Sequence, residues 1–176
     1  KQLPMLVIDN KYEICQSMAI MTFIENLAGI NISDPILNAK ANAIMQSAQE
    51  LFMPLNPTVN FATGEKFVKK KEKMTPFLIS RFEDLENALK ENDKKFFIYN
   101  EPRACDFVTF HHLDLSKLLD PLIIKKFPRL ENFLDDMMSI ASIKSYLDKR
   151  PKLIDVSVEP KLVIDGIAHP TGVKKT

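Results

Sequence analysis

Cysteine and histidine are scarce in this sequence, which limits the chemistry it can hold. The 176 residues include two cysteines, Cys15 and Cys105, which lie far apart and form no Cys-x-x-Cys motif. This pattern argues against a disulfide framework and against a zinc site. Of the three histidines, His111 and His112 are adjacent and so point to different sides of a helix, while His169 stands apart in the tail. We therefore expect no metal and a reducing, cytoplasmic setting.

Excess charge and long apolar stretches are also missing. The formal net charge is +1, so neither nucleic acid nor an anionic membrane is an expected partner. The one basic run, at 69–73, falls within a helical pattern and is best explained as a solvated helix face. No apolar stretch reaches the roughly 18 residues of a membrane span, and there is no signal-peptide pattern. The composition, 45% hydrophobic and 27% charged, is typical of a soluble globular protein.

The chain opens with the pattern of a β-hairpin. Met5–Ile8 is a short apolar run and Tyr12–Cys15 alternates in polarity. Between them, Asn10 tolerates the positive φ of a tight turn, whereas Lys11 stands where glycine is the more usual residue.

A helix is expected next, over about residues 17–28. Ser17 is a candidate N-cap and Gly29 a natural C-terminal stop. Its apolar positions recur at helical spacing. They are Ile20, Phe23, Ile24 and Leu27. A short polar segment follows, and Pro35 then stands where a first helical residue would.

From Pro35 to Arg150 the pattern predicts helix after helix. A loop is expected over 55–63, and Pro76 predicts a kink or a break in the helix that contains it. The helices are expected over about 35–53, 65–92, 104–119, 128–138 and 140–149. The stripe of the second consists of Phe67, Met74, Leu78, Phe82, Leu85 and Leu89.

Several short motifs occur in order along the chain. They are QLPML at 2–6, QS at 16–17, TPFL at 75–78, LE at 85–86, END at 91–93, ACDF at 104–107, FPRL at 127–130, IKSYL at 143–147 and KRP at 149–151. Together these motifs resemble the cytosolic glutathione transferase family, most closely its sigma class. Their order and spacing make the resemblance far more specific than one motif would, and it covers about residues 1–151. The mu class also carries a C-terminal extension, so a mu-like tail is an alternative.

The resemblance implies an α+β protein built in two parts. Residues 1–30 would be the remnant of a thioredoxin-like glutathione-binding domain, and 31–34 a linker. Residues 35–151 would form an all-helical C-terminal domain, and 152–176 a tail that lies against the protein. The implied partners are glutathione, as a substrate, an apolar electrophile, and a second copy of the chain in a homodimer.

The resemblance also implies a glutathione site at the start of the chain. Pro4 would follow a cis peptide bond and leave the backbone of Leu3 free to pair with the extended tripeptide as an added strand. Ser17, at a helix start, would bind a carboxylate, and Gln16 would bond the γ-glutamyl end. Gln2 is expected to act similarly. The alternatives are an ordinary trans proline and a plain helix cap.

Two positions depart from the family pattern. In sigma enzymes an aspartate on the first helix of the helical domain reaches glutathione across the dimer. Gln46 occupies that position here, so either the contact is weaker or Glu50, one turn later, substitutes. Asp106 resembles a buried structural aspartate that ties the start of a helix to its cap. Arg103 stands where a serine or threonine would complete the capping box, so this cap must be made differently.

No catalytic residue can be named in this chain. The family activates the glutathione thiol, whose pKa is about 8.5 when free, with a tyrosine near the end of its first strand. None of Tyr12, Tyr99 and Tyr146 matches that motif. The resemblance implies that about 45–50 residues of a small βαβ unit precede Lys1 and hold the tyrosine.

Two functions stay open. The first is an enzyme that conjugates the glutathione thiolate to electrophilic, apolar small molecules in detoxification. The second is a non-catalytic relative that binds ligands or serves as a structural or scaffold protein. The second-substrate pocket would draw on residues 50–54 and on the tail. The methionines, such as Met18, Met21, Met45, Met53 and Met74, are expected mainly in the core, with some lining the pocket.

Overall fold

A β-hairpin opens the computed structural model, which describes residues 3–59, 62, 64–150, 154–155, 161–164 and 167–170. Strands β1 (Met5–Ile8) and β2 (Tyr12–Cys15) pair antiparallel, as predicted. Asp9 and Asn10 in the turn both have a φ of 52°. Because these two residues take the left-handed conformation, Lys11 does not need to be glycine, and its N–H donates to the Ile8 carbonyl at 3.0 Å.

Helix α1 (Ser17–Leu27) follows and ends where the sequence predicts. Gly29 has a φ of 68°, which glycine adopts without the steric cost of a Cβ atom. The Gly29 N–H donates to the Asn26 carbonyl at 3.1 Å, and the Ile30 N–H donates to the Glu25 carbonyl at 3.2 Å. These two bonds form a Schellman motif that satisfies the last carbonyls of the helix.

The packed face of α1 differs from the predicted stripe. Ile24 is 44% exposed and Leu27 is 76% exposed, and no residue of the helix is fully buried. Met18 and Met21 instead pack against the core. The spacing of the apolar residues therefore predicted the helix correctly, but it did not predict that Met18 and Met21 are the residues that pack against the core.

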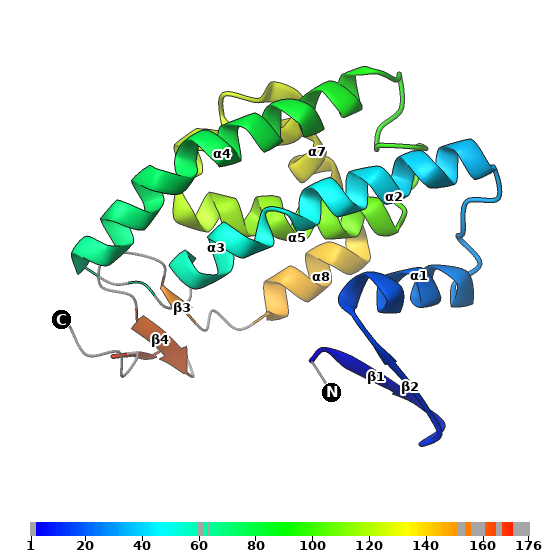
Figure 1. The fold of residues 1–176 in the computed structure, drawn as a ribbon, viewed down its shortest axis with the longest axis horizontal. Helices are drawn as coiled ribbons and strands as arrows, with labels where there is room; N and C mark the ends of the chain where they lie inside the picture. Colours follow the sequence, from blue (N-terminus) through cyan, green and yellow to red (C-terminus); the bar gives the residue numbers. More distant parts are fainter. Residues whose placement is uncertain are drawn as a thin grey trace.

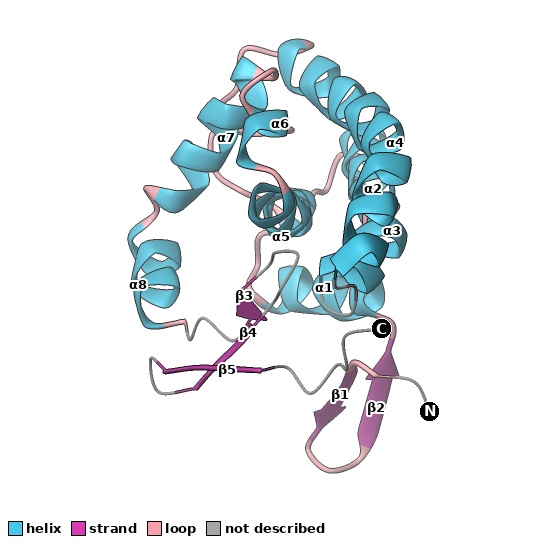
Figure 2. Cartoon of the chain, turned by 90° about the vertical axis from the view of Figure 1, so that its left-hand side faces the viewer, coloured by secondary structure: helices cyan, strands magenta, loops and turns pink. Residues whose placement is uncertain are grey.

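Within the described residues, seven further helices form the body of the molecule, with α5 running through its centre (Figures 1 and 2). α5 packs against α2, α3, α6 and α7 and also touches α1. The core lies between these helices, and the predicted stripe of α4 is buried within it. The helices are α2 (Pro35–Gln49), α3 (Phe52–Val59), α4 (Gly64–Lys90), α5 (Ala104–Leu119), α6 (Pro121–Ile124), α7 (Pro128–Met138) and α8 (Ala141–Lys149).

The prediction of one helix over 35–53 and a loop over 55–63 is wrong. α2 ends at Gln49, and α3 begins at Phe52 and is helical through Val59. Pro54 lies in the first turn of α3, where a backbone N–H needs no helical partner. Leu55 is fully buried and Thr58 is 2% exposed, so core packing stabilises a helix that local propensity disfavours.

Two other differences concern prolines. α4 continues through Pro76 without a break, so of the two predicted alternatives only a kink stays a prediction; beside Pro76 the Thr75 hydroxyl donates to the Lys71 carbonyl at 2.8 Å. The short helix α6 was not predicted. It begins at Pro121 after Asp120, whose side chain accepts the Leu122 N–H at 3.0 Å.

The tail contains a small antiparallel sheet that the sequence did not predict. Its strands are β3 (Ile154–Asp155), β4 (Lys161–Ile164) and β5 (Ile167–Pro170), in the order β3-β4-β5. That the tail lies against the protein stays a prediction. Among the described helices, none combines the length and apolar character that crossing a membrane requires.

Candidate functional site

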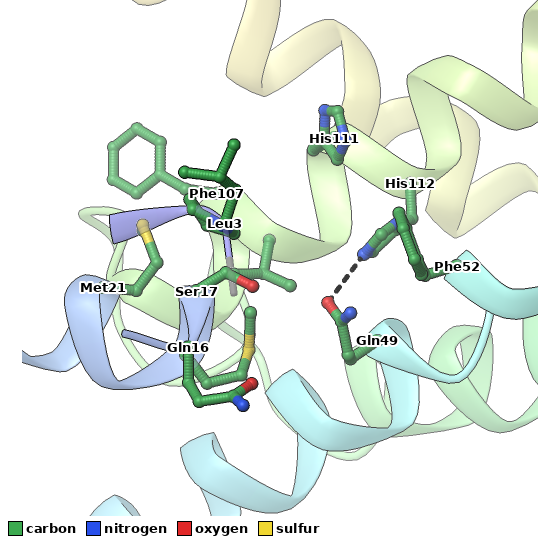
Figure 3. A pocket seen from close by; sticks show the side chains of 12 residues that line it. Leu3, Gln16, Ser17, Met21, Gln49, Phe52, Phe107, His111 and His112 are labelled. Atoms are coloured by element: carbon green, nitrogen blue, oxygen red, sulfur yellow. Dashed lines mark hydrogen bonds between the residues drawn. The ribbon is translucent and has the colours of Figure 1, made fainter. Parts of the chain in front are cut away.

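A cavity of about 400 Å³ lies where the start of the chain meets the helical body. This volume is within the range of small-molecule sites, roughly 300–1,000 Å³. One wall consists of Leu3, Pro4, Gln16, Ser17, Met18 and Met21. The other consists of Gln49, Phe52, Phe107, Val108, His111 and His112 (Figure 3). Four of the residues expected to bind glutathione thus line one cavity, and the fifth, Gln2, lies outside the described residues.

The first wall begins with Leu3 and Pro4, just before β1. The Leu3–Pro4 peptide bond is cis, as the resemblance implies. The ladder between β1 and β2 begins at the pair Met5 and Cys15, so pairing within the hairpin does not use the backbone of Leu3. Leu3 is 84% exposed. An extended ligand therefore has room to lie along this edge.

Gln16 and Ser17 meet the cavity at the start of α1. Ser17 is the first helical residue, so the expectation that it caps the helix is wrong; Gln16 holds the N-cap position. Neither side chain bonds a first-turn N–H, and both line the cavity. Gln16 has a φ of 74°, a conformation that is uncommon for a residue with a Cβ atom and is often found at functional sites.

The second wall carries a polar pair in apolar surroundings. His112 is 2% exposed, and its Nε2 lies 3.2 Å from Oε1 of Gln49, the last residue of α2. Burial, with a smaller contribution from the nearby His111, lowers the pKa of His112 to about 4. His112 is therefore neutral near pH 7. The ring of Phe52 packs edge-on against it, with centroids 6.4 Å apart.

Both adjacent histidines line the cavity, which the sequence reasoning did not foresee. Their ring centroids lie 5.1 Å apart, so consecutive positions on α5 did not separate them onto opposite sides. The missed signal was their spacing: Phe107 and His111, like Val108 and His112, are four residues apart and share a helix face. Burial lowers the pKa of His111, while Asp114 opposes that shift. No cluster of three or more metal-binding side chains occurs among the described residues.

The other expectations for the cavity have mixed outcomes. Phe52 falls within the predicted 50–54 segment, whereas Gln49 was missed. Met18 and Met21 line the cavity, Met45 and Met74 are buried in the core, and Met53 is 73% exposed. Any contribution of the tail side chains lies outside the described residues.

Asp106 fixes the start of α5 behind this wall. Its carboxylate is fully buried and accepts the Phe97 N–H at 3.0 Å and the Arg103 N–H at 2.8 Å. Since a guanidinium has no acceptor, Arg103 cannot return the bond, and only this half of a capping box forms. Burial outweighs these hydrogen bonds and raises the pKa of Asp106 to about 6.

A further contact joins the two walls. Glu25, near the end of α1, accepts the Ala104 N–H of α5 through Oε1 at 3.0 Å. No local sequence pattern predicts this bond, because its partners are 79 positions apart. It holds α1 against the first turn of the helix that carries Phe107 and both histidines.

Similar proteins support one family. Residues 50–150, more than half of the chain, match the family model described as "Glutathione S-transferase, C-terminal domain". Glutathione S-transferase P 10 of Caenorhabditis elegans is 27% identical over 149 residues, covering 85% of this chain and 69% of the relative. The glutathione S-transferase class-mu 26 kDa isozyme 1 of Fasciola hepatica is 26% identical over 141 residues, covering 80% of this chain and 62% of the relative.

Solved structures agree on the fold. The glutathione S-transferase Blo t 8 superposes with a TM-score of 0.72 at 19% identity, covering 84% of this chain and 68% of that one. The Pi-class glutathione S-transferase of Onchocerca volvulus superposes with a TM-score of 0.71 at 20% identity, covering 81% of this chain and 68% of that one. The hairpin and the helical body of this chain agree with the family match and with the fold of these solved structures. The chain belongs to the glutathione S-transferase family.

Proposed function

We propose that the protein conjugates glutathione to electrophilic, mostly apolar small molecules, a detoxifying reaction. The observation that carries the proposal is the cavity, because Leu3, Pro4, Gln16 and Ser17 line one side of it and a helical wall with both apolar and polar side chains lines the other. Glutathione would occupy the first side and the electrophile the second. We further propose that the protein acts as a homodimer in the cytoplasm, without a metal, and that its class is nearest to sigma.

The first wall suits a charged, extended tripeptide. The backbone of Leu3 would pair with the central residue of glutathione as an added strand. The open N-terminus of α1 would favour a carboxylate, since the helix dipole and the free N–H groups both stabilise negative charge. Ser17 would contribute its hydroxyl there, and the Gln16 amide would both donate and accept. Gln2 would contact the same ligand.

Thiol activation needs a donor that stabilises the sulfur anion. The described tyrosines are placed elsewhere: Tyr12 is 55% exposed, Tyr146 is 62% exposed, and the ring of Tyr99 lies 4.7 Å from the Arg103 guanidinium carbon. None of the three lines the cavity. We propose that the donor is a tyrosine encoded upstream of Lys1.

The test uses the full-length protein, including any residues that precede Lys1. Binding to immobilised glutathione and turnover of an aromatic chloride are measured for the wild type and for Gln16→Ala and Ser17→Ala. Each variant should lose about tenfold or more in affinity, since each removes a hydrogen bond to a charged ligand. Ser33→Ala, an exposed serine outside the cavity, is the matched control.

The outcomes separate the candidate functions. Binding with turnover, weakened by the two cavity variants but not by the control, supports the enzyme and its site. Binding without turnover would replace the enzyme with a ligand-binding relative. Failure of the wild type to bind glutathione would overturn the site assignment.

A further inference from the structure

Helix α5 receives part of its cap from outside the helical body. Arg103 holds the N-cap position, and its guanidinium has no hydrogen-bond acceptor to offer the first turn. The N–H of Ala104, the first helical residue, is accepted instead by Oε1 of Glu25 at 3.0 Å. Because Glu25 belongs to α1, this bond joins the part of the chain that precedes the helical body to the start of α5.

Glu25 is an unfavourable residue for α1 taken alone. A carboxylate near a helix C-terminus faces the negative end of the helix dipole, whereas the N-terminus of α5 offers the positive end. Within the described part of the chain no residue of α1 is fully buried, so apolar burial holds this helix against α5 only weakly. A hydrogen bond to a charged acceptor is therefore a large part of the contact between the two helices.

We propose that Glu25 is a positioning residue for conjugation: by bonding the Ala104 N–H it sets the distance between the sulfur of bound glutathione and the electrophile. The inference rests on the proposed function, since it needs glutathione on the first wall and the electrophile on the second. Glu25 lies outside the lining of the cavity, so it acts through the two helices and touches neither substrate.

Short pieces of helix connect this contact to both walls. Ser17 lies eight residues before Glu25 on α1, about 12 Å along the helix axis. Phe107 lies within one turn of Ala104 on α5. Reacting atoms must approach to about 3–3.5 Å in alignment, and a misplacement of about 1 Å can lower a rate about 100-fold. Loss of the Glu25 contact should therefore shift one wall relative to the other while leaving each wall intact.

This geometry separates the rate from the affinity for glutathione. Leu3, Pro4, Gln16 and Ser17 line the cavity from the side of the hairpin and α1, so they should keep their arrangement when the bond to α5 is lost. Removing the Glu25 carboxylate should lower the rate of the chemical step by about tenfold. The dissociation constant of glutathione should stay within about twofold of the wild-type value.

The test uses the full-length protein with 1-chloro-2,4-dinitrobenzene as the electrophile. The glutathione thiolate forms a C–S bond to the ring carbon, and chloride leaves with the electron pair of the C–Cl bond. Single-turnover rates report this step, and isothermal titration calorimetry gives the dissociation constant of glutathione. Glu25→Ala should show the loss of rate. Glu25→Gln keeps an acceptor oxygen at the same reach and should stay within about threefold of the wild type. Glu72→Ala, at an exposed glutamate of α4, is the matched control.

A second substitution distinguishes positioning from simple helix capping. Arg103→Ser places a hydroxyl at the N-cap of α5, where it can accept the Asp106 N–H. It would complete a capping box, since the Asp106 carboxylate already accepts the N–H of residue 103 at 2.8 Å. Added to Glu25→Ala, this change should raise the melting temperature toward that of the wild type but leave the rate about tenfold low, because the new cap does not reach α1. If Glu25→Ala alone is unfolded in the assay, the double variant carries the same test.

Each other outcome identifies what is wrong. If the double variant recovers the rate together with the melting temperature, Glu25 is only a helix cap and the inference is overturned. A tenfold weaker binding of glutathione with an unchanged single-turnover rate would place Glu25 in the glutathione site instead. If neither rate nor affinity changes in Glu25→Ala, the inference fails while the proposed function stands. If the wild type does not conjugate the electrophile, the proposed function fails and this inference fails with it.

Discussion

Helix α7 is capped by a residue from another helix, which makes its stability testable at one position. Phe127 holds the N-cap position of α7 and offers no capping oxygen. Glu86 of α4 supplies the acceptors instead: its Oε1 accepts the Arg129 N–H at 3.2 Å, and its Oε2 accepts the Leu130 N–H at 2.8 Å. Glu86 is 4% exposed, so water cannot readily replace it.

The cost of removing this cap follows from the two hydrogen bonds. An N–H left unsatisfied in a buried position costs about 1–3 kcal/mol, and a lost cap costs about 0.5–2 kcal/mol. We expect Glu86→Ala to lower the free energy of unfolding by about 3 kcal/mol, which for a chain of this size corresponds to roughly 6–12 °C in Tm. Glu86→Gln keeps one oxygen and should cost about half as much.

Urea unfolding followed by circular dichroism measures these differences. Glu83→Gln, on an exposed position of the same helix, is the control for the loss of charge. Lys90→Met tests the ion pair, in which Nζ lies 2.8 Å from Glu86 Oε1; Lys90 is 58% exposed there, so its loss should cost less than about 1 kcal/mol. Equal costs for Glu86→Ala and Lys90→Met would refute the capping argument and assign the effect to the ion pair.

Three other predictions follow from local geometry. The pKa of Asp106 is raised to about 6 in the folded protein, so the native state binds more protons than the unfolded state between pH 4 and pH 6. The unfolding free energy of the wild type relative to Asp106→Asn should therefore fall by about 2 kcal/mol as the pH rises from 4 to 7; a pH-independent difference would contradict the burial argument. Gly29→Ala should lower stability by about 1 kcal/mol in urea titrations through strain at its positive φ alone, since a Cβ there meets no atom within 4 Å. Asp34→Ala should lower the free energy of unfolding by about 1 kcal/mol in the same assay, because the Asp34 carboxylate accepts the Ile36 and Leu37 N–H groups at the start of α2. An unchanged stability in Gly29→Ala would contradict the strain argument, and an unchanged stability in Asp34→Ala would contradict the capping argument.

Local signals in the sequence predicted most elements well. The bounds of both strands, and of α5 and α7, follow from alternation, helical spacing and the prolines at 121 and 128. The helix over 52–59 was missed because its two prolines argue against helix, whereas the burial of Leu55 and Thr58 outweighs that preference. Local propensity cannot include that burial, since it depends on the distant helices that cover these side chains.

The two walls of the cavity differed in how far the sequence could predict them. The first wall carries motifs that are contiguous in the chain, so a resemblance could point to Gln16 and Ser17. The second wall combines the end of α2 with the middle of α5, 63 positions apart at the bond between Gln49 and His112. Such a pair leaves no local pattern, and each residue alone is more often an ordinary polar side chain than part of a site.

The relative placement of the two walls depends on the contact between α1 and α5. α1 carries Ser17 at one end and Glu25 near the other, where Glu25 bonds the first N–H of α5. Asp106, two residues further on, fixes the same turn of α5 through the Phe97 N–H. The turn that precedes Phe107 and the histidines is therefore held by two carboxylates, one buried and one half-buried. Because the hydrogen bonds lie outside the cavity, substrate can occupy both walls without breaking the contacts that position them.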